Sequence, residues 1–320
     1  MTYLVTGCAG FIGSQICERL LSQNQSVIGI DSFTDYYARQ QKLNNLAFVR
    51  NQPGFQFIEG DLVTLNLPEI LQSIDCVFHT AGQPGVRGSW GTQFDVYLHN
   101  NIHATQQLLE AIKQLQRNIR VVYSSSSSVY GNTNQLPTSE TALPRPYSPY
   151  GTTKLAAEHL CHLYHDNYGI PVVSLRYFTV YGPRQRPDMA FHRFCKAILH
   201  GQPITVLGDG NQTRDFTYVD DIVTANLDAA TKPVEGGIYN LGGGSRVSVN
   251  QVLGMLARIA QKEPIVEYKQ PTKGDVRDTS ADTARARQEL GYSPSTSLEE
   301  GLKRQFDWVS ETYAASSTAD

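Results

Sequence analysis

Near the N-terminus the chain reads Tyr3-Leu4-Val5-Thr6-Gly7-Cys8-Ala9-Gly10-Phe11-Ile12-Gly13, an apolar run followed by glycines at three-residue spacing. Apolar residues then recur every four positions, at Ile12, Ile16 and Leu20. This pattern predicts a strand, a glycine turn and a helix. Glycines let the backbone pass close to a pyrophosphate, which free N–H groups at the helix N-terminus stabilise. The spacing G-x-x-G-x-x-G differs from the commoner G-x-G-x-x-G.

A second apolar run, Val27-Ile28-Gly29-Ile30, ends at Asp31, 18 residues beyond Gly13. A carboxylate at this place accepts hydrogen bonds from ribose hydroxyls and repels a 2′-phosphate. The sequence therefore predicts a site for NAD rather than NADP. An ordinary tight turn is the alternative explanation of the glycines, but the strand before them, the helix after them and the acid disfavour it.

Tyr150 and Lys154 are four residues apart, in Tyr150-Gly151-Thr152-Thr153-Lys154. On a helix this spacing puts both side chains on one face. A nearby ammonium favours the phenolate and lowers the pKa of a tyrosine from its reference of ~10. We therefore predict that Tyr150 is a general base. A packed tyrosine beside a solvated lysine on a surface helix is the alternative.

Strand and helix patterns alternate up to about residue 180. Such alternation predicts an α/β fold with a parallel sheet covered by helices on both faces, whose ligands bind at the carboxyl ends of the strands. The further predicted strands are 55–58, 76–78, 121–123 and 172–175. Helix starts with a capping-box pattern occur at Ser248 with Gln251 and at Ser297 with Glu300.

The composition limits the classes of function. The net charge of −3 provides no basic surface for nucleic acid. There is neither a zinc-type Cys/His cluster nor an apolar stretch of membrane-spanning length, so we expect no metal and no membrane partner. The five cysteines have no paired spacing and fit free thiols in a reducing compartment. Because the chain starts in a core strand, without room for a signal peptide, we expect a cytoplasmic enzyme.

Taken together, these motifs resemble the extended short-chain dehydrogenase/reductase family, in its nucleotide-sugar branch, over nearly the whole chain. The further matching motifs are Gly60-Asp61-Leu62, His79-Thr80-Ala81-Gly82, Asn101, Arg176-Tyr177-Phe178, Tyr181-Gly182-Pro183, Arg214-Asp215-Phe216, Val219-Asp220-Asp221 and Gly274-Asp275-Val276-Arg277. The resemblance implies a Rossmann-type doubly wound sheet in an NAD-binding domain, residues 1–181. Residues 182–320 would be a smaller mixed α/β domain for substrate, with segments returning to the main sheet. It also implies a homodimer.

Site residues follow from the same resemblance. Arg214 and Arg277 match positions that contact a nucleoside diphosphate, and Asp275 matches one that accepts from the nucleotide ribose. The base is uracil or thymine, with uridine the family's commoner choice. The implied cofactor residues are Gly7, Gly10, Phe11, Ile12, Gly13, Asp31, Asp61, Leu62, Thr80, Ala81, Asn101, Tyr150, Lys154 and Tyr177.

The serine run Ser124 to Ser128 selects the reaction. In this branch the tyrosinate takes the proton of the sugar 4-OH while C4 gives its hydride to NAD, forming a 4-keto sugar. Dehydratases place Asp-Glu at Ser127 and Ser128, and decarboxylases usually place Glu at Ser128. A serine hydroxyl cannot perform that proton transfer near neutrality. What remains is return of the hydride to the other face, which is 4-epimerisation, with Ser126 relaying to Tyr150.

The sugar is predicted to be a uronic acid. Galactose-type epimerases generally have asparagine at the position of Thr179, and Arg186 follows seven residues later. Together with Ser127 and Ser128, these residues can hold a C5 carboxylate, and Arg87 is a weaker candidate. The stretch 176–189 resembles bacterial UDP-glucuronate 4-epimerases.

Three alternatives stay open at this point. The chain could be a UDP-glucose/UDP-galactose 4-epimerase, or a UDP-glucuronate decarboxylase with an unusual serine. A third possibility, from another class, is a non-catalytic NAD-sensing protein. Ser126, Tyr150 and Lys154 disfavour the sensor, because a binding module has no need of all three.

Overall fold

The structure is a computed structural model that describes residues 1–270 and 274–316. Its centre is a seven-stranded sheet in the order β11-β6-β5-β4-β1-β2-β3, with every neighbouring pair parallel. The strands are β1 (Thr2–Thr6), β2 (Ser26–Asp31), β3 (Phe55–Glu59), β4 (Cys76–His79), β5 (Arg120–Ser126), β6 (Val172–Tyr177) and β11 (Ile238–Leu241). The six strands predicted from the sequence are confirmed, and β11 is an addition from the second half of the chain.

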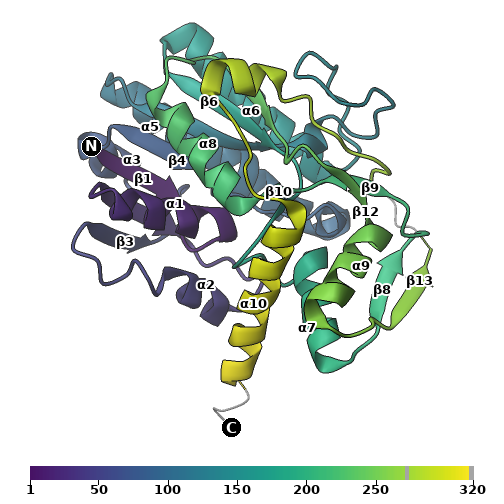
Figure 1. Cartoon of the computed structure of the whole chain (residues 1–320). Helices are drawn as coiled ribbons and strands as arrows, with labels where there is room; N and C mark the ends of the chain where they lie inside the picture. Colours follow the sequence, from purple (N-terminus) through teal and green to yellow (C-terminus); the bar gives the residue numbers. More distant parts are fainter. Residues whose placement is uncertain (271–273, 317–320) are drawn as a thin grey trace.

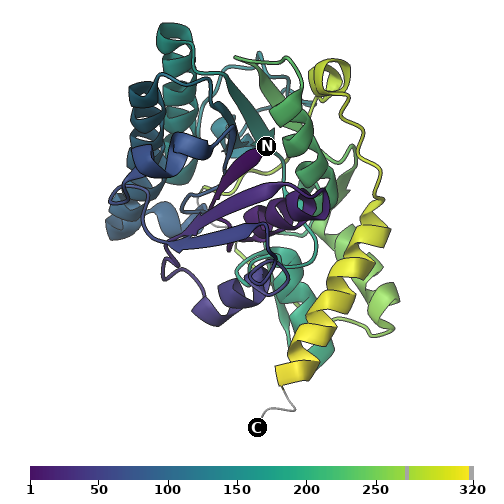
Figure 2. The same cartoon turned by 90° about the vertical axis from the view of Figure 1, so that its left-hand side faces the viewer.

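Helices cover both faces of this sheet (Figures 1 and 2). Successive strand residues point to opposite faces, so Val5 joins one apolar core and Leu4 the other. The first core includes α1 (Phe11–Ser22) and α8 (Val219–Thr231). The helices of the second face and its edge are α3 (Leu67–Ile70), α4 (Phe94–Tyr97), the π-helix η4 (Leu98–His103), α5 (Ala104–Leu115) and α6 (Pro149–Tyr168). This is the doubly wound arrangement that the sequence predicts.

A smaller lobe lies at the carboxyl edge of the sheet, at the lower right of Figure 1. It combines helices with short two-stranded sheets, β8 with β13 in parallel and β9 with β12 antiparallel. Its elements are α7 (Ala190–His200), β8 (Ile204–Leu207), β9 (Thr213–Asp215), β12 (Arg246–Ser248), α9 (Val249–Ala260), β13 (Val266–Lys269) and α10 (Leu298–Ser316). Strand β7 (Val180–Tyr181) pairs with β10 (Thr217–Tyr218) at the junction.

The remaining elements are short. They are α2 (Arg39–Leu46) after β2, the 3₁₀-helices η1 (Leu71–Ser73), η2 (Arg87–Ser89), η3 (Gly91–Gln93) and η5 (Ser127–Val129), and the π-helix η6 (Ala286–Leu290).

Local signals in the second half agree with the structure. Helix α9 has the predicted capping box of Ser248 and Gln251, and Ser297 Oγ accepts from the N–H of Glu300 at the start of α10. All five cysteines are free and buried, as predicted. Within residues 1–270 and 274–316, no helix is long and apolar enough to span a membrane, and no group of three His, Cys, Asp or Glu side chains is placed to hold a metal ion.

Candidate active site

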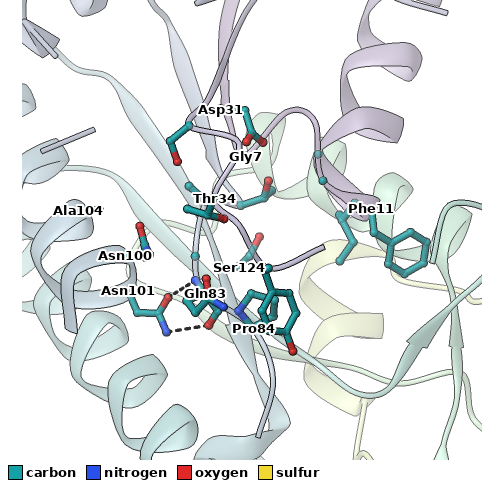
Figure 3. A pocket seen from close by; sticks show the side chains of 18 of the residues that line it. Gly7, Phe11, Asp31, Thr34, Gln83, Pro84, Asn100, Asn101, Ala104 and Ser124 are labelled. Atoms are coloured by element: carbon teal, nitrogen blue, oxygen red, sulfur yellow. Dashed lines mark hydrogen bonds between the residues drawn. The ribbon is translucent and has the colours of Figure 1, made fainter. Parts of the chain in front are cut away.

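A cavity opens where the central strands end, and we call it the inner cavity. All fourteen residues predicted to bind the cofactor line it, although they come from positions spread between residues 7 and 177. Parallel strands place their carboxyl ends at one edge of the sheet, which is why these positions meet. Figure 3 shows part of this lining, with Gly7, Phe11 and Asp31 on one side and Asn101 and Gln83 on the other.

The glycine loop forms a close-fitting backbone cradle. Gly7 has φ +70°, and a Cβ atom at Gly13 would lie 2.3 Å from the Gly7 carbonyl oxygen. The Gly7 N–H donates to Ile30 O at 2.7 Å, which ties the loop to β2. In the first turn of α1, the N–H groups of Phe11 and Ile12 have no acceptor within the helix. The cradle therefore presents free donors and the positive end of a helix dipole to an anion.

Two carboxylates follow the strands beside this cradle. Asp31 accepts from the N–H groups of Ala9 and Phe33 at 3.0 and 2.9 Å, and burial raises its pKa above the ordinary value. Asp61 Oδ2 lies 2.7 Å from His99 Nε2. Burial tends to raise the pKa of Asp61, but hydrogen bonds from the Val63 N–H and from His99 bring it below the ordinary value.

The π-helix η4 carries Asn101 into the inner cavity. Its side chain accepts from the Gln83 N–H at 2.6 Å and donates to Gln83 O at 3.1 Å (Figure 3) and to Thr153 Oγ1 at 2.9 Å. Asn101 thus joins the loop after β4 to α6, next to Lys154. Single π-helical turns frequently occur at functional sites because they redirect side chains.

Lys154 is 6% exposed, and its ammonium lies 4.4 Å from the centre of the Tyr123 ring. Within the described part of the chain, no hydrogen bond or ion pair reaches this ammonium. Burial lowers the pKa of Lys154 to about 8. An unpaired buried ammonium that lines a cavity is suited to ligand hydroxyls. It has three N–H donors, which is enough to reach both hydroxyls of a ribose.

Tyr150 differs from the sequence prediction in one respect. Burial raises its pKa above the ordinary value, while the hydrogen bond with Ser126 and the charge of Arg186 oppose that rise. The lowering by Lys154 that the four-residue spacing predicts is wrong, because the pKa of Tyr150 is raised. Both groups are buried, and desolvation is the largest influence on the pKa of each. Ser126 also caps η5, because its Oγ accepts from the Ser128 N–H at 3.1 Å.

A larger outer cavity, of about 1000 Å³, adjoins the inner one. Arg214 is anchored there by bonds to Arg277 O at 2.8 Å and Val276 O at 2.6 Å, and Arg277 reaches Asp209 at 3.3 Å. The predicted substrate residues that line the outer cavity are Arg87, Thr179, Arg186, Arg214, Asp275 and Arg277. Two arginines predicted for a diphosphate thus share one cavity with a volume suited to a nucleotide sugar.

Ser127 and Ser128 line a third, smaller cavity, together with Thr179. Arg214 and Asp275 also line it, so it continues from the outer cavity. Arg87 is not among its lining residues, and instead forms an ion pair with Asp275 at 2.8 Å. Arg186 is not among its lining residues either, and it shares only the outer cavity with Thr179, whereas Arg214 lines both of these cavities.

Sequence reasoning missed several polar residues of these cavities, among them Tyr36, Asp188 and Arg193. Tyr36 and Arg186 line both the inner and the outer cavity, and Asp188 and Arg193 line the outer one. Of these, only Arg186 was predicted. No local pattern marks Tyr36, Asp188 or Arg193, because each reaches the site through a loop path or a helix packing that a short motif does not encode.

The fold and the site define a class. A parallel sheet with a glycine cradle, an acid after the second strand and a tyrosine–lysine pair on the helix after β5 is the arrangement of the extended short-chain dehydrogenases/reductases. The model of the NAD dependent epimerase/dehydratase family matches residues 3–242, and the chain belongs to this family.

Relatives with the same length support this assignment. The chain is 44% identical to the uncharacterized UDP-glucose epimerase YtcB of Bacillus subtilis, over 98% of this chain and 99% of that protein. It is 40% identical to the UDP-glucuronate 4-epimerase of Thermodesulfobacterium geofontis, over 97% and 96%. Among solved structures, UDP-glucuronic acid 4-epimerase from Bacillus cereus, in complex with UDP-glucuronic acid and NAD, has a TM-score of 0.95 and 45% identity, over 98% and 100%.

Proposed function

We propose that this protein is an NAD-dependent isomerase that interconverts UDP-glucuronate and UDP-galacturonate through a 4-keto intermediate. The observation that carries the proposal is the small cavity that Ser127, Ser128 and Thr179 line together. At Ser127 and Ser128 the family resemblance implies carboxylates in dehydratases and decarboxylases, and this chain has hydroxyl groups there. The similarity to the Bacillus cereus enzyme and to the named UDP-glucuronate 4-epimerases agrees with it.

The inner cavity fits NAD. The glycine cradle would take the pyrophosphate, Asp31 the adenosine ribose, and the unpaired ammonium of Lys154 the other ribose. Asp61 and Leu62 would lie at the adenine, and Thr80, Ala81, Asn101 and Tyr177 along the rest of the cofactor. Bound NAD would accept the hydride of C4 and return it.

Proton transfer falls to Tyr150 and Ser126. Tyr150 takes the proton of the sugar 4-OH and gives it back in the return step, and Ser126 orients the 4-oxygen. Lys154 assists by its positive charge once ribose hydroxyls surround it.

Control of the product depends on the carboxylate. A 4-keto uronate is a β-keto acid, which loses carbon dioxide when its carboxylate turns perpendicular to the plane of the carbonyl group. Ser127, Ser128 and Thr179 donate hydroxyl hydrogen bonds that resist this turn, and Arg186 supplies one positive charge. Because the hydroxyl groups of Ser127 and Ser128 cannot act as an acid or a base near neutrality, the keto sugar rotates and is reduced on its other face.

The outer cavity holds the nucleotide part of the substrate in this proposal. Arg214 and Arg277 contact the diphosphate, Asp275 the ribose, and Arg87 acts through Asp275. We keep the division into residues 1–181 for NAD and 182–320 mainly for substrate. A homodimer and a cytoplasmic location also remain part of the proposal.

A UDP-glucose/UDP-galactose 4-epimerase is the second candidate, because the Bacillus subtilis relative is named a UDP-glucose epimerase. The two reactions differ only at the group on C5. They share the cofactor, the tyrosine and the nucleotide site, so only the sugar tested can separate them.

Incubation of the purified protein with UDP-glucuronate, without added NAD, is the deciding experiment. We expect UDP-galacturonate as the main product by NMR, with much slower turnover of UDP-glucose and UDP-galactose. Preferred turnover of a neutral sugar would establish the second candidate instead, and UDP-4-keto-pentose as the main product would establish a decarboxylase.

Variants test the carboxylate site directly. Arg186→Ala removes a charge-assisted contact of about 1.5–3 kcal/mol, so turnover of UDP-glucuronate should fall roughly tenfold to a hundredfold. Arg184→Ala is the matched control, because Arg184 lies in the same segment but pairs with Glu18. Thr179→Ala should raise the share of decarboxylated product. Equal losses on UDP-glucose and UDP-glucuronate in Arg186→Ala would contradict the carboxylate contact.

A further inference from the structure

Arg186 lies between the inner and outer cavities, and one side of its guanidinium is already occupied. Nε donates to Asp188 Oδ1 and Nη2 donates to Asp188 Oδ2, both at 3.0 Å. A guanidinium has five N–H donors arranged in a planar fork. The Nε side is therefore filled by Asp188, and the end formed by the two Nη atoms keeps its donors for a ligand.

Tyr36 fixes this pair from the loop after β2. Its hydroxyl donates to Asp188 Oδ2 at 3.1 Å, and the Arg186 guanidinium lies 5.8 Å from the centre of its ring. A Cβ atom at Gly85 would lie 2.3 Å from the Tyr36 hydroxyl, so that loop also holds the tyrosine in place. Burial raises the pKa of Tyr36 to about 12, and it stays a donor at neutral pH.

Asp188 therefore compensates a charge that acts on two groups. One is Tyr150, whose phenolate form Arg186 favours. The other, if the proposed function holds, is the C5 carboxylate of the substrate. Among the described residues, the other titratable groups around Tyr150 include Lys154 one turn further along α6, Tyr97 on α4 and Tyr123 on β5.

We propose that Asp188, held by Tyr36, is a positioning residue that limits the attraction of Arg186 for the substrate carboxylate. The 4-keto sugar is then oriented by Arg186 but can still rotate to present its other face. This inference deepens the proposed function and rests on it. Epimerisation requires the sugar to present both faces to the cofactor. An arginine without a counterion would bind the carboxylate tightly before and after the rotation of the sugar and lose that contact during it, which slows the rotation.

The proposed role also accounts for the geometry of the Arg186–Asp188 pair. A buried arginine gains a counterion and a fixed orientation from a carboxylate on its flank, but that carboxylate also weakens its attraction for a second carboxylate. Here the flanking carboxylate is built in and held by a tyrosine that lines both cavities. Asp188 thus both fixes the guanidinium plane and compensates the positive charge of Arg186.

Asp188→Asn tests this inference, because it keeps the size of the side chain and removes its charge. In the NAD-bound enzyme, affinity for UDP-glucuronate measured by calorimetry should rise about tenfold, since one nearby negative charge is gone. Affinity for UDP-glucose, which has no carboxylate, should stay close to that of the wild type. The kcat for UDP-glucuronate should fall, so that kcat and KM decrease together.

The pH profile provides a readout that a purely structural role would not change. Without Asp188, the charge of Arg186 acts on Tyr150 without compensation, so the acid limb of kcat/KM should move to lower pH. Asp188→Glu keeps the charge and should keep the wild-type limb. Tyr36→Phe, which removes only the hydroxyl that holds Asp188, should shift affinity and kcat in the same directions by smaller factors.

Glu18→Gln is the matched control. Glu18 pairs with Arg184 in the same segment, and neither residue lines the described cavities, so affinity, kcat and the acid limb should stay unchanged. If Asp188→Asn weakens both sugars equally and leaves the acid limb in place, Asp188 is only a scaffold and the inference is wrong. If the wild type itself binds and turns over UDP-glucose better than UDP-glucuronate, it is the proposed function that fails, and that failure is visible before any variant is made.

Discussion

Lys154→Met should stabilise the NAD-free protein while it abolishes turnover. Methionine keeps most of the length of the side chain and removes the ammonium. Burial lowers the pKa of Lys154 from 10.5 to about 8. At about 1.4 kcal/mol per pKa unit, keeping this buried cation protonated costs about 3 kcal/mol of folding free energy. Loss of the contact with the Tyr123 ring, 4.4 Å away, returns up to about 2 kcal/mol.

The expected net gain is thus about 1–3 kcal/mol at neutral pH. With an unfolding entropy of about 2.1 cal/mol/K per residue and 320 residues, this corresponds to a rise in Tm of about 2–4 °C. The direction in which this stability difference changes with pH follows from the linkage between protonation and folding. Below pH 8 the lysine is protonated in both states and the full penalty applies, whereas above 10.5 it is neutral in both and the penalty disappears.

The assay is denaturation of wild type and Lys154→Met, both stripped of nucleotide, by heat or urea at pH 7.5 and pH 10. The part of the difference in unfolding free energy that comes from desolvation of Lys154 should shrink from about 3 kcal/mol at pH 7.5 to below about 1 kcal/mol at pH 10. Added NAD should reverse the order, because only the wild type gains the contacts of the ammonium with ligand hydroxyls. A variant that is less stable than wild type at pH 7.5, or a difference that does not change with pH, would refute the reasoning.

Three further predictions follow from the same geometry. Tyr150→Phe should retain NAD and lose turnover by at least ~10², whereas Tyr168→Phe, at the exposed far end of α6, should keep wild-type rates. Release of bound nucleotide from the purified protein should give NAD, and neither accumulation of NADH during turnover nor a preference for NADP is compatible with Asp31 and the proposed cycle. Glu158→Gln should lower the free energy of unfolding by about 3 kcal/mol, because Arg176 and Glu158 are 3% and 1% exposed. The same change at Glu300, whose partner Arg304 is exposed, should cost less than about 1 kcal/mol, as measured by urea denaturation.

Much of this site follows from local sequence. The glycine turn, the acid after the second strand and the capping box of α9 each depend on residues a few positions apart, and the structure forms them as predicted. The clustering of distant cofactor residues also follows, because parallel strands share one carboxyl edge.

Other features depend on tertiary packing and could not be predicted from the sequence. The pKa of Tyr150 is raised because burial acts on it and on Lys154 together, and burial is a property of the whole fold. Strand β11 joins the main sheet next to β6 although about 60 residues separate them in sequence. No spacing rule connects Tyr36 with Asp188, which are 152 residues apart and meet only where the loop after β2 and the segment before α7 come together at the outer cavity.

Lys154 and Arg186, two of the cations that line the cavities, have opposite surroundings, and the difference matches what their proposed ligands must do. Within the described residues Lys154 has no hydrogen-bonding partner, so its charge is available to a cofactor that stays in place through every turnover. Arg186 has a built-in counterion, and its proposed ligand is a sugar that must turn between the two hydride transfers. An uncompensated charge favours tight and permanent binding, whereas a compensated one permits release and rotation. If so, exchanging the two arrangements should harm each step in its own way: a counterion near Lys154 should weaken retention of the cofactor, and loss of Asp188 should slow turnover while it tightens binding of the uronate.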